Sequence, residues 1–310
     1  MKLSVIICTH NPREEFIRRT LVALFQQSLP LAEWELLLID NASEAPLVGR
    51  IDLSWHPQGR HLQEPKLGKL NAWLMGMREA RADVLLFVDD DNVLANDYLE
   101  QALAVGIQWP FVGAWGGSVI PEFEIPLPEW VGDQVWRLTS VNVKEDVWSN
   151  LREDFATYPV GAGMCIRRSV ADRYLEWCRT NQRSSALDRS GKGLAGYGDM
   201  DLCQCAIDVG LGAGRSIKLK LTHLIPKSRL TLDYFVRHAE GDAASYLAYR
   251  AIRGMPYRDM ARYSWFKSLV WWLHCLKRRV PREQREIHSA YLRGLKRGLQ
   301  LAEEISKLST

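Results

Sequence analysis

Short apolar runs alternate with stretches of helical spacing along the first ninety residues. Three runs, at 3–8, 35–40 and 84–88, are mostly apolar, which is typical of strands buried on both faces. Between them, residues 16–25 and 68–80 carry apolar side chains at a spacing of three and four, which predicts helices. This alternation predicts an α/β fold with a largely parallel, doubly wound sheet covered by helices on both faces.

The boundaries of later elements follow from the same patterns. Asn11 and Pro12 fit the N-cap and the first position of the earlier helix. Residues 121–157 are rich in proline and tryptophan and predict a loop-rich insertion. Strands are expected at 158–167 and 215–223, and helices from Ser169 and from Leu202. Because the spacing is helical after Pro226, we expect an α/β domain, 1–226, and a helical C-terminal extension, 227–310.

Composition limits the class of protein. The 310 residues are 47% hydrophobic and 25% charged, which suits one large domain and a smaller part. No run of 18 apolar residues predicts a transmembrane span, and the N-terminal sequence lacks the small-residue site that ends a secretory signal. The six cysteines form no CxxC pair, which favours a reducing compartment. We therefore expect a cytoplasmic protein.

Charge is distributed unevenly along the chain. Residues 227–310 contain 17 basic and 8 acidic residues, whereas the preceding residues have a net charge of −6. A basic part can bind nucleic acid, an anionic membrane or a phosphorylated ligand, but no nucleic-acid-binding motif accompanies it. Aromatic and apolar residues at 265–276, followed by basic residues at 277–279, fit an amphipathic helix at the inner face of a membrane. Packing of this segment against the first domain is the alternative.

Polar residues end three of the expected strands. Thr9, Asp40 and the triplet Asp89–Asp91 follow apolar runs, and the carboxyl ends of parallel strands line one edge of a sheet, where ligands bind. Asp89 and Asp91 offer the oxygen ligands that Mg²⁺ or Mn²⁺ takes while it bridges to a diphosphate. A solvated acidic turn that caps the next helix is the alternative. An ATPase is excluded because the chain has no GxxxxGKS or GxxxxGKT loop.

Asp40 is a candidate for nucleotide recognition, because a carboxylate can accept a hydrogen bond from a base N–H or a ribose hydroxyl. It could equally cap a turn through Asn41, Ala42 and Ser43. A dehydrogenase is disfavoured, since the loop after the first strand is Thr-His-Asn-Pro and lacks the GxGxxG pattern.

Six segments in order resemble inverting glycosyltransferases of family 2, which have the GT-A fold. The segments are SVIICTHNP, LLLID, GKLNAW, FVDDDN, VGAGMCIRR and GYGDMDLC, and they extend over about residues 3–229. The resemblance implies transfer of a sugar from a nucleoside-diphosphate sugar, with UDP as the first choice and GDP and dTDP as alternatives. The acceptor implied is a hydroxyl group of a saccharide or glycolipid, in polysaccharide or cell-surface glycan synthesis.

The resemblance also implies roles for individual residues. Donor-binding roles fall on Thr9, Asp40, Lys69, Asn71 and Asp89, with Lys227 and Arg229 stabilising the leaving diphosphate. The implied ligands of a divalent metal, Mn²⁺ or Mg²⁺, are Asp89, Asp91 and His223, and the implied acceptor-side residues are Gly161, Gly163 and Asp201. Asp199 is the implied catalytic base, because it matches the second member of a Glu-Asp pair that opens a helix. Gly198 replaces the Glu here, and Asp201 is a weaker candidate for the base.

Plainer alternatives stay open for these residues and for the function. His223 could be a hydrogen-bonded histidine of the core, and Asp199 and Asp201 could complement a helix dipole. A nucleotidyltransferase could use the same fold and acids, but it would need a glycine-rich, basic loop after the first strand. A non-catalytic nucleotide- or carbohydrate-binding protein is the other alternative, because Gly198 departs from the expected acidic pair.

Overall fold

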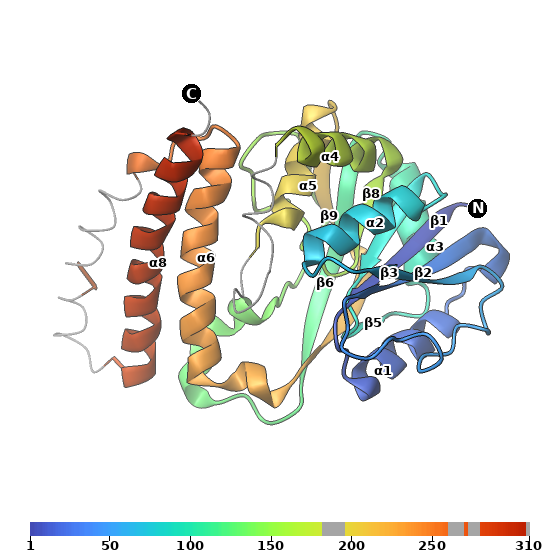
Figure 1. The fold of residues 1–310 in the computed structure, drawn as a ribbon, viewed down its shortest axis with the longest axis horizontal. Helices are drawn as coiled ribbons and strands as arrows, with labels where there is room; N and C mark the ends of the chain where they lie inside the picture. The colour runs from blue at the N-terminus through green and yellow to red at the C-terminus, as the bar shows by residue number, and fades with distance from the viewer. Residues whose placement is uncertain (182–195, 260–269, 272–279, 308–310) are drawn as a thin grey trace. The chain divides into compact units, whose positions relative to one another are not determined.

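The computed structural model describes residues 1–181, 196–259, 270–271 and 280–307 (Figure 1). The chain forms two compact units. The first comprises Met1–Glu122, Thr139–Thr180 and Gly198–Ile225, and the second comprises Phe123–Leu138, Asn181–Tyr197 and Pro226–Thr310. The segment for which a membrane-surface helix is predicted, 265–279, lies outside the described residues except for Val270 and Trp271.

Within its described residues, the first unit contains a nine-stranded sheet with the order β3-β2-β1-β4-β8-β6-β9-β5, and β7 pairs with β9 outside this path. The strands are β1 (Leu3–Thr9), β2 (Trp34–Asn41), β3 (Gly59–Glu64), β4 (Val84–Val88), β5 (Asn92–Leu94), β6 (Val112–Phe123), β7 (Val147–Ser149), β8 (Met164–Arg167) and β9 (Gly212–Ile225).

The sheet is mixed. Strands β1 to β4 pair in parallel, as the apolar sequences of β1, β2 and β4 predict, whereas the polar β3 is not predicted. The expectation of a largely parallel sheet is wrong for the other half, where β8 runs antiparallel to β4 and β6, and both β5 and β7 run antiparallel to β9. The first eight residues of β6 are buried. In β9, buried and more exposed positions alternate over residues 219–223, which is typical of antiparallel strands with one face toward water.

Helices cover both faces of the sheet, as predicted. They are α1 (Glu14–Phe25), α2 (Lys69–Glu79), α3 (Tyr98–Gln108), α4 (Arg168–Thr180) and α5 (Gly198–Asp208), with a 3₁₀ turn η1 (Leu31–Glu33). Side chains of α1 and α3, such as Leu24 and Leu99, share one core with the sheet. Helices α2, α4 and α5 lie on the opposite face (Figure 1). Their side chains, such as Met77 and Val170, share a second core with the sheet. This arrangement brings α2 and α5 to the same face.

Two local predictions are wrong. Asn11 does not cap α1, which begins at Glu14. Its backbone has a φ of +49°, and its side-chain Oδ1 accepts a hydrogen bond from Glu44 N at 2.9 Å instead. The strand expected at 158–167 covers only Met164–Arg167, because Gly163 has a φ of +71°, which ends the extended backbone.

The second unit is helical. Its described elements are η2 (Glu129–Leu138), η4 (Lys227–Leu230), α6 (Leu232–Ile252) and α8 (Arg282–Lys307). Helices α6 and α8 lie side by side around a small core that includes Leu247 and Leu295 (Figure 1). Their backbones approach closely, since a Cβ on Gly298 would lie 2.9 Å from Cα of Ala244. Among the residues described, no helix has both the length and the apolar character needed to cross a membrane.

Candidate active site

The acidic triplet follows β4 at the carboxyl edge of the parallel strands, and its middle member is bound by the protein itself. Strands β1 and β4 pair in parallel, so the ends of both lie next to each other. The Thr9 hydroxyl at the end of β1 donates a hydrogen bond to the Asp90 carboxylate. The Thr20 hydroxyl of α1 donates to the Asp90 carbonyl oxygen at 3.1 Å. Asp90 therefore joins β1, α1 and β4, which leaves Asp89 and Asp91 for other partners.

Asp89 forms an ion pair with Lys69. The distance from Lys69 Nζ to Asp89 Oδ1 is 2.6 Å, and both side chains are partly exposed. Lys69 lies in the first turn of α2, and its ammonium group lies 5.1 Å from the centre of the Trp73 ring. A partly exposed lysine at a helix N-terminus is suited to bind a phosphate group.

Asp91 lies next to His223. Strand β5 pairs with β9 so that Asn92 is opposite His223, and Leu224 N donates to the Asp91 carbonyl at 2.9 Å. This register places His223 Nε2 3.4 Å from Asp91 Oδ2. Asn92 Nδ2 donates to Asp91 Oδ1 at 3.0 Å, and Asn92 Oδ1 accepts from Asp89 N at 3.1 Å. The buried Asn92 thus orients the carboxylate of one aspartate and the backbone of the other.

The Asp91 and His223 side chains are ligand types that Mn²⁺ accepts, whereas Asp89 is paired with Lys69. No three His, Cys, Asp or Glu side chains in the described part of the chain are grouped tightly enough to enclose a metal ion. Asp91 and His223 are two candidate ligands here, and Asp89, which is paired with Lys69, stays a predicted third. Such a set fits a divalent ion that takes its other ligands from phosphates and water, as Mg²⁺ usually does.

The loop after β2 is held by Asp40 and Asn41. Both oxygens of the buried Asp40 carboxylate accept backbone hydrogen bonds, from Ser43 N at 3.0 Å and from Leu47 N at 3.1 Å. Asn41 Oδ1 accepts from Gly68 N at 2.9 Å, immediately before α2. Asp40 thus makes the turn contacts that the alternative interpretation describes, and Asn41 positions the start of the helix that carries Lys69.

Asn71 lies on the first turn of α2, where its Nδ2 donates to the Leu67 carbonyl at 3.2 Å. Lys227 and Arg229 lie on η4 of the second unit, where Lys227 N donates to Glu124 at 2.7 Å. Donor binding by Asp40, Asn71, Lys227 and Arg229 stays a prediction.

The expected base, Asp199, opens α5. Its Oδ2 accepts a hydrogen bond from Gly161 N at 3.1 Å, and its Oδ1 accepts from Met200 N at 2.9 Å. Asp199 is partly exposed, whereas Asp201 is fully buried and accepts from Trp177 Nε1 at 3.1 Å. Solvent therefore reaches Asp199 but not Asp201 in this structure.

Tyr98 binds the glycine segment, residues 161–163, that lies beside Asp199. The Tyr98 hydroxyl donates to the Gly163 carbonyl at 2.7 Å, and both residues are buried. Burial raises the pKa of the Tyr98 phenol well above its ordinary value, so the hydroxyl stays protonated and donates. Burial together with the Asp199 carboxylate raises the pKa of the Cys203 thiol as well, which keeps this thiol neutral.

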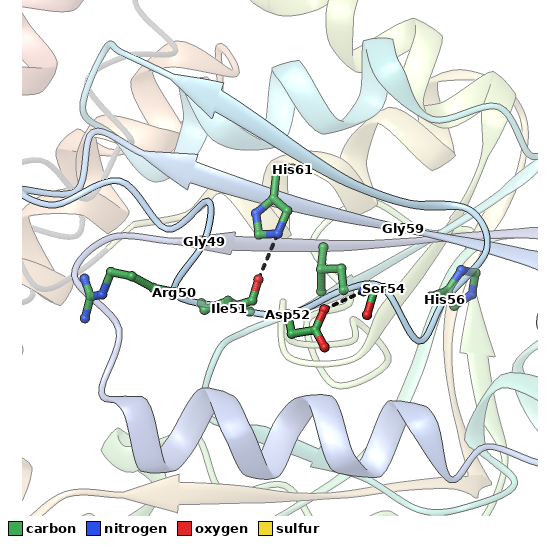
Figure 2. A pocket seen from close by; sticks show the side chains of 9 residues that line it. Gly49, Arg50, Ile51, Asp52, Ser54, His56, Gly59 and His61 are labelled. Carbon is green, nitrogen blue, oxygen red and sulfur yellow. Dashed lines mark hydrogen bonds between the residues drawn. The ribbon is translucent and has the colours of Figure 1, made fainter.

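A pocket of about 550 Å³ lies elsewhere in the first unit, along the segment that connects β2 to β3 (Figure 2). Its lining includes Arg50, His56 and His61, and the His61 ring bonds to the Ile51 carbonyl at 3.0 Å. None of the site residues predicted from the sequence lines this pocket.

Comparison with known proteins decides the family. Residues 4–174, more than half of the chain, match the family model described as Glycosyl transferase family 2. The chain belongs to this family. No curated protein matches the sequence of this glycosyltransferase.

Solved structures resemble the glycosyltransferase in fold. A mannosyltransferase, PcManGT from Pyrobaculum calidifontis, in complex with GDP-Man and Mn²⁺, has a TM-score of 0.55 and 16% identity, and the match covers 99% of this chain and 74% of that one. S. aureus TarS 1-349 has a TM-score of 0.50 and 14% identity, with 100% and 92% covered. A second TarS structure has a TM-score of 0.46 and 17% identity, and the match covers 77% of this chain and 39% of that one. Together with the family, the likeness to the mannosyltransferase confirms the expected α/β fold of GT-A type.

Sequence reasoning missed several residues of this glycosyltransferase site. Asn92 and Tyr98 each bond to a predicted site residue, Asp91 and Gly163 respectively, and Asn41 bonds to Gly68, which directly precedes Lys69. Asn92 directly follows the acidic triplet, and Asn41 directly follows Asp40, so adjacency to a candidate was a usable signal for both. Tyr98 lies 65 positions before Gly163, and no local pattern connects the two.

Proposed function

We propose that this protein is an inverting glycosyltransferase that moves a sugar from a nucleoside-diphosphate sugar to a hydroxyl group of a saccharide or glycolipid. The proposal rests on two groups of side chains in the first unit. One offers Lys69, Asp91 and His223, which suit a diphosphate with a divalent ion. The other offers the partly exposed carboxylate of Asp199, which suits a reacting hydroxyl group.

The donor half rests on charge. Lys69 Nζ can exchange its contact with Asp89 for a phosphate oxygen, because both side chains are partly exposed. A divalent ion bound by Asp91 and His223 would neutralise charge that develops on the leaving diphosphate. The GDP-Man and Mn²⁺ bound by the mannosyltransferase neighbour support a nucleotide-sugar donor and a metal here. Thr9, Asp40 and Asn71 complete the proposed donor side, and Lys227 and Arg229 add positive charge from the extension.

The acceptor half rests on geometry. Two backbone N–H groups hold the Asp199 carboxylate, so it is oriented before the acceptor arrives. A carboxylate within about 3 Å of the acceptor hydroxyl removes its proton as the new bond forms, which contributes about 10²- to 10⁴-fold in rate. Gly161 and Gly163 are buried, and their proposed acceptor-side role is to shape the backbone that holds Asp199. The basic extension, 227–310, would bring a cytoplasmic enzyme to an anionic membrane surface that carries a glycolipid acceptor.

Calorimetric titration with UDP, GDP and dTDP, each with and without Mn²⁺, tests the donor half. We expect one nucleotide to bind in the presence of Mn²⁺, with at least about tenfold weaker binding by Asp91→Asn. Asp172→Ala, which removes an exposed carboxylate from α4, is the matched control and should bind like the wild type. Failure of every nucleotide to bind would overturn the proposal.

Turnover tests the acceptor half. With the nucleotide sugar that the titration selects, Asp199→Asn should lower kcat by about 10²- to 10⁴-fold and leave the nucleotide Kd within about threefold of the wild type. An Asp199→Asn variant with wild-type kcat would remove this residue from the chemistry.

A further inference from the structure

We propose that Trp73 is a positioning residue that couples the donor-binding helix α2 to the catalytic base. This inference rests on the proposed function, because it assigns Lys69 to the donor and Asp199 to the acceptor. Trp73 ends the segment GKLNAW, but the sequence alone predicts no role for it. Its contacts indicate one, because its ring lies near both halves of the site.

One side of the Trp73 ring contacts the donor half. Trp73 follows Lys69 by one helical turn, and its ring centre lies 5.1 Å from Lys69 Nζ. The ring also packs on Phe87, with 4.8 Å between the ring centres, and Phe87 precedes Asp89 by two residues on β4. The ring therefore touches the two elements that carry the Lys69–Asp89 ion pair.

The outer edge of the indole contacts the acceptor half. A Cβ atom on Gly161 would lie 3.3 Å from Trp73 Cη2, and one on Gly198 would lie 3.5 Å from Trp73 Cζ3. Both glycines thus lie beside the six-membered ring, close enough that an added methyl group would touch it. Gly161 N donates to Asp199, and Gly198 precedes Asp199 in the chain. The ring edge sets how far the two backbone segments that hold the base lie from α2.

Trp73 also lies close to position 198. A Cβ atom built there would lie 3.5 and 4.0 Å from Trp73 Cζ3 and Cε3, which is ordinary van der Waals contact. Trp73 is itself only 4% exposed, so the ring has little space in which to move aside. The ring therefore bounds the space next to Gly198, the residue that precedes Asp199.

Trp73→Phe tests the coupling, because it removes the outer ring edge while it keeps an aromatic ring next to Phe87. We expect kcat for release of nucleoside diphosphate from the selected nucleotide sugar to fall by about 10- to 100-fold, since a shift of about 1 Å costs about 10² in rate. The nucleotide Kd should stay within about threefold of the wild type. Trp115→Phe, a fully buried tryptophan packed on the opposite face of the sheet, controls for lost stability and should keep kcat within about threefold.

Gly161→Ala provides a second variant with an opposite effect on volume. Its Cβ at 3.3 Å from the ring should displace the segment and lower kcat, and Trp73→Phe in the same chain should restore part of that loss by opening space. Equal kcat for Trp73→Phe and Trp115→Phe, or no rescue in the double variant, would overturn the coupling while the proposed function stands. Absence of turnover in the wild type with every nucleotide sugar would overturn both.

Discussion

Tyr98→Phe removes a single hydroxyl group from beneath the glycine segment of the site. Tyr98 is 1% exposed, and its hydroxyl donates to the Gly163 carbonyl at 2.7 Å. The substitution keeps the ring and deletes only the donor. It therefore leaves a buried carbonyl group without this hydrogen bond, in a segment whose conformation is already restricted by the positive φ of Gly163.

The expected cost follows from that lost hydrogen bond. A buried polar group that loses its partner costs about 1–3 kcal/mol, and the change in packing is small because one oxygen atom is removed. The substitution changes no charge, since burial keeps the phenol protonated and neutral. The free energy of unfolding of the first unit should therefore fall by about 1–3 kcal/mol. With a urea dependence of about 3 kcal/mol/M, the midpoint of its transition should fall by about 0.3–1 M.

Urea denaturation followed by circular dichroism measures this change. Tyr234→Phe, at a half-buried tyrosine of α6 in the second unit, is the control and should shift its midpoint by less than about 0.2 M. Gly163→Ala should cost more than Tyr98→Phe, because its Cβ would lie 2.5 Å from the Tyr98 hydroxyl oxygen and the φ is positive. A wild-type midpoint for Tyr98→Phe would refute the reasoning.

Three further predictions concern stability. Glu35→Gln should lower the free energy of unfolding, measured by urea denaturation, by about 1.5–3 kcal/mol, because the fully buried carboxylate accepts a charged hydrogen bond from Arg60 at 3.2 Å. The control is Glu79→Gln, at a more exposed partner of the same arginine, which should cost less than about 1 kcal/mol. Burial lowers the pKa of His56 below 6.5, so the unfolded chain binds more protons than the folded chain and stability falls as the pH drops through that value. The Tm of His56→Asn should therefore drop less than the Tm of the wild type between about pH 7 and pH 5. Gly298→Ala should destabilise the second unit by about 1–3 kcal/mol in thermal denaturation, because its Cβ would lie 2.9 Å from the α6 backbone.

The sequence by itself determined the local elements and the ends of the strands. Apolar runs predicted β1, β2 and β4, and spacing predicted α1 and α2, because burial on both faces or on one helical stripe leaves a pattern within ten or so residues. The same runs placed Thr9, Asp40 and the acidic triplet at strand ends. Six ordered segments then identified the family, which the family model confirms.

Antiparallel pairing in the second half of the sheet and the start of α1 were not determined in this way. Asn11 has the residue type of an N-cap, but a bond to Glu44, 33 positions away, decides its conformation. Strand pairing depends on which distant segments bury each other's apolar faces. A short apolar run such as that of β8 therefore does not indicate which strand it pairs with or in which direction.

Only the tertiary structure decided which partner each acidic residue of the triplet takes. Asp89, Asp90 and Asp91 are the same residue type in adjacent positions, yet they contact Lys69, Thr9 and His223 respectively. The backbone after β4 turns successive side chains in different directions, and the chain brings each partner from a different strand or helix. The residue type fixes which interactions a side chain can make, whereas the packing of distant elements decides which partner it contacts.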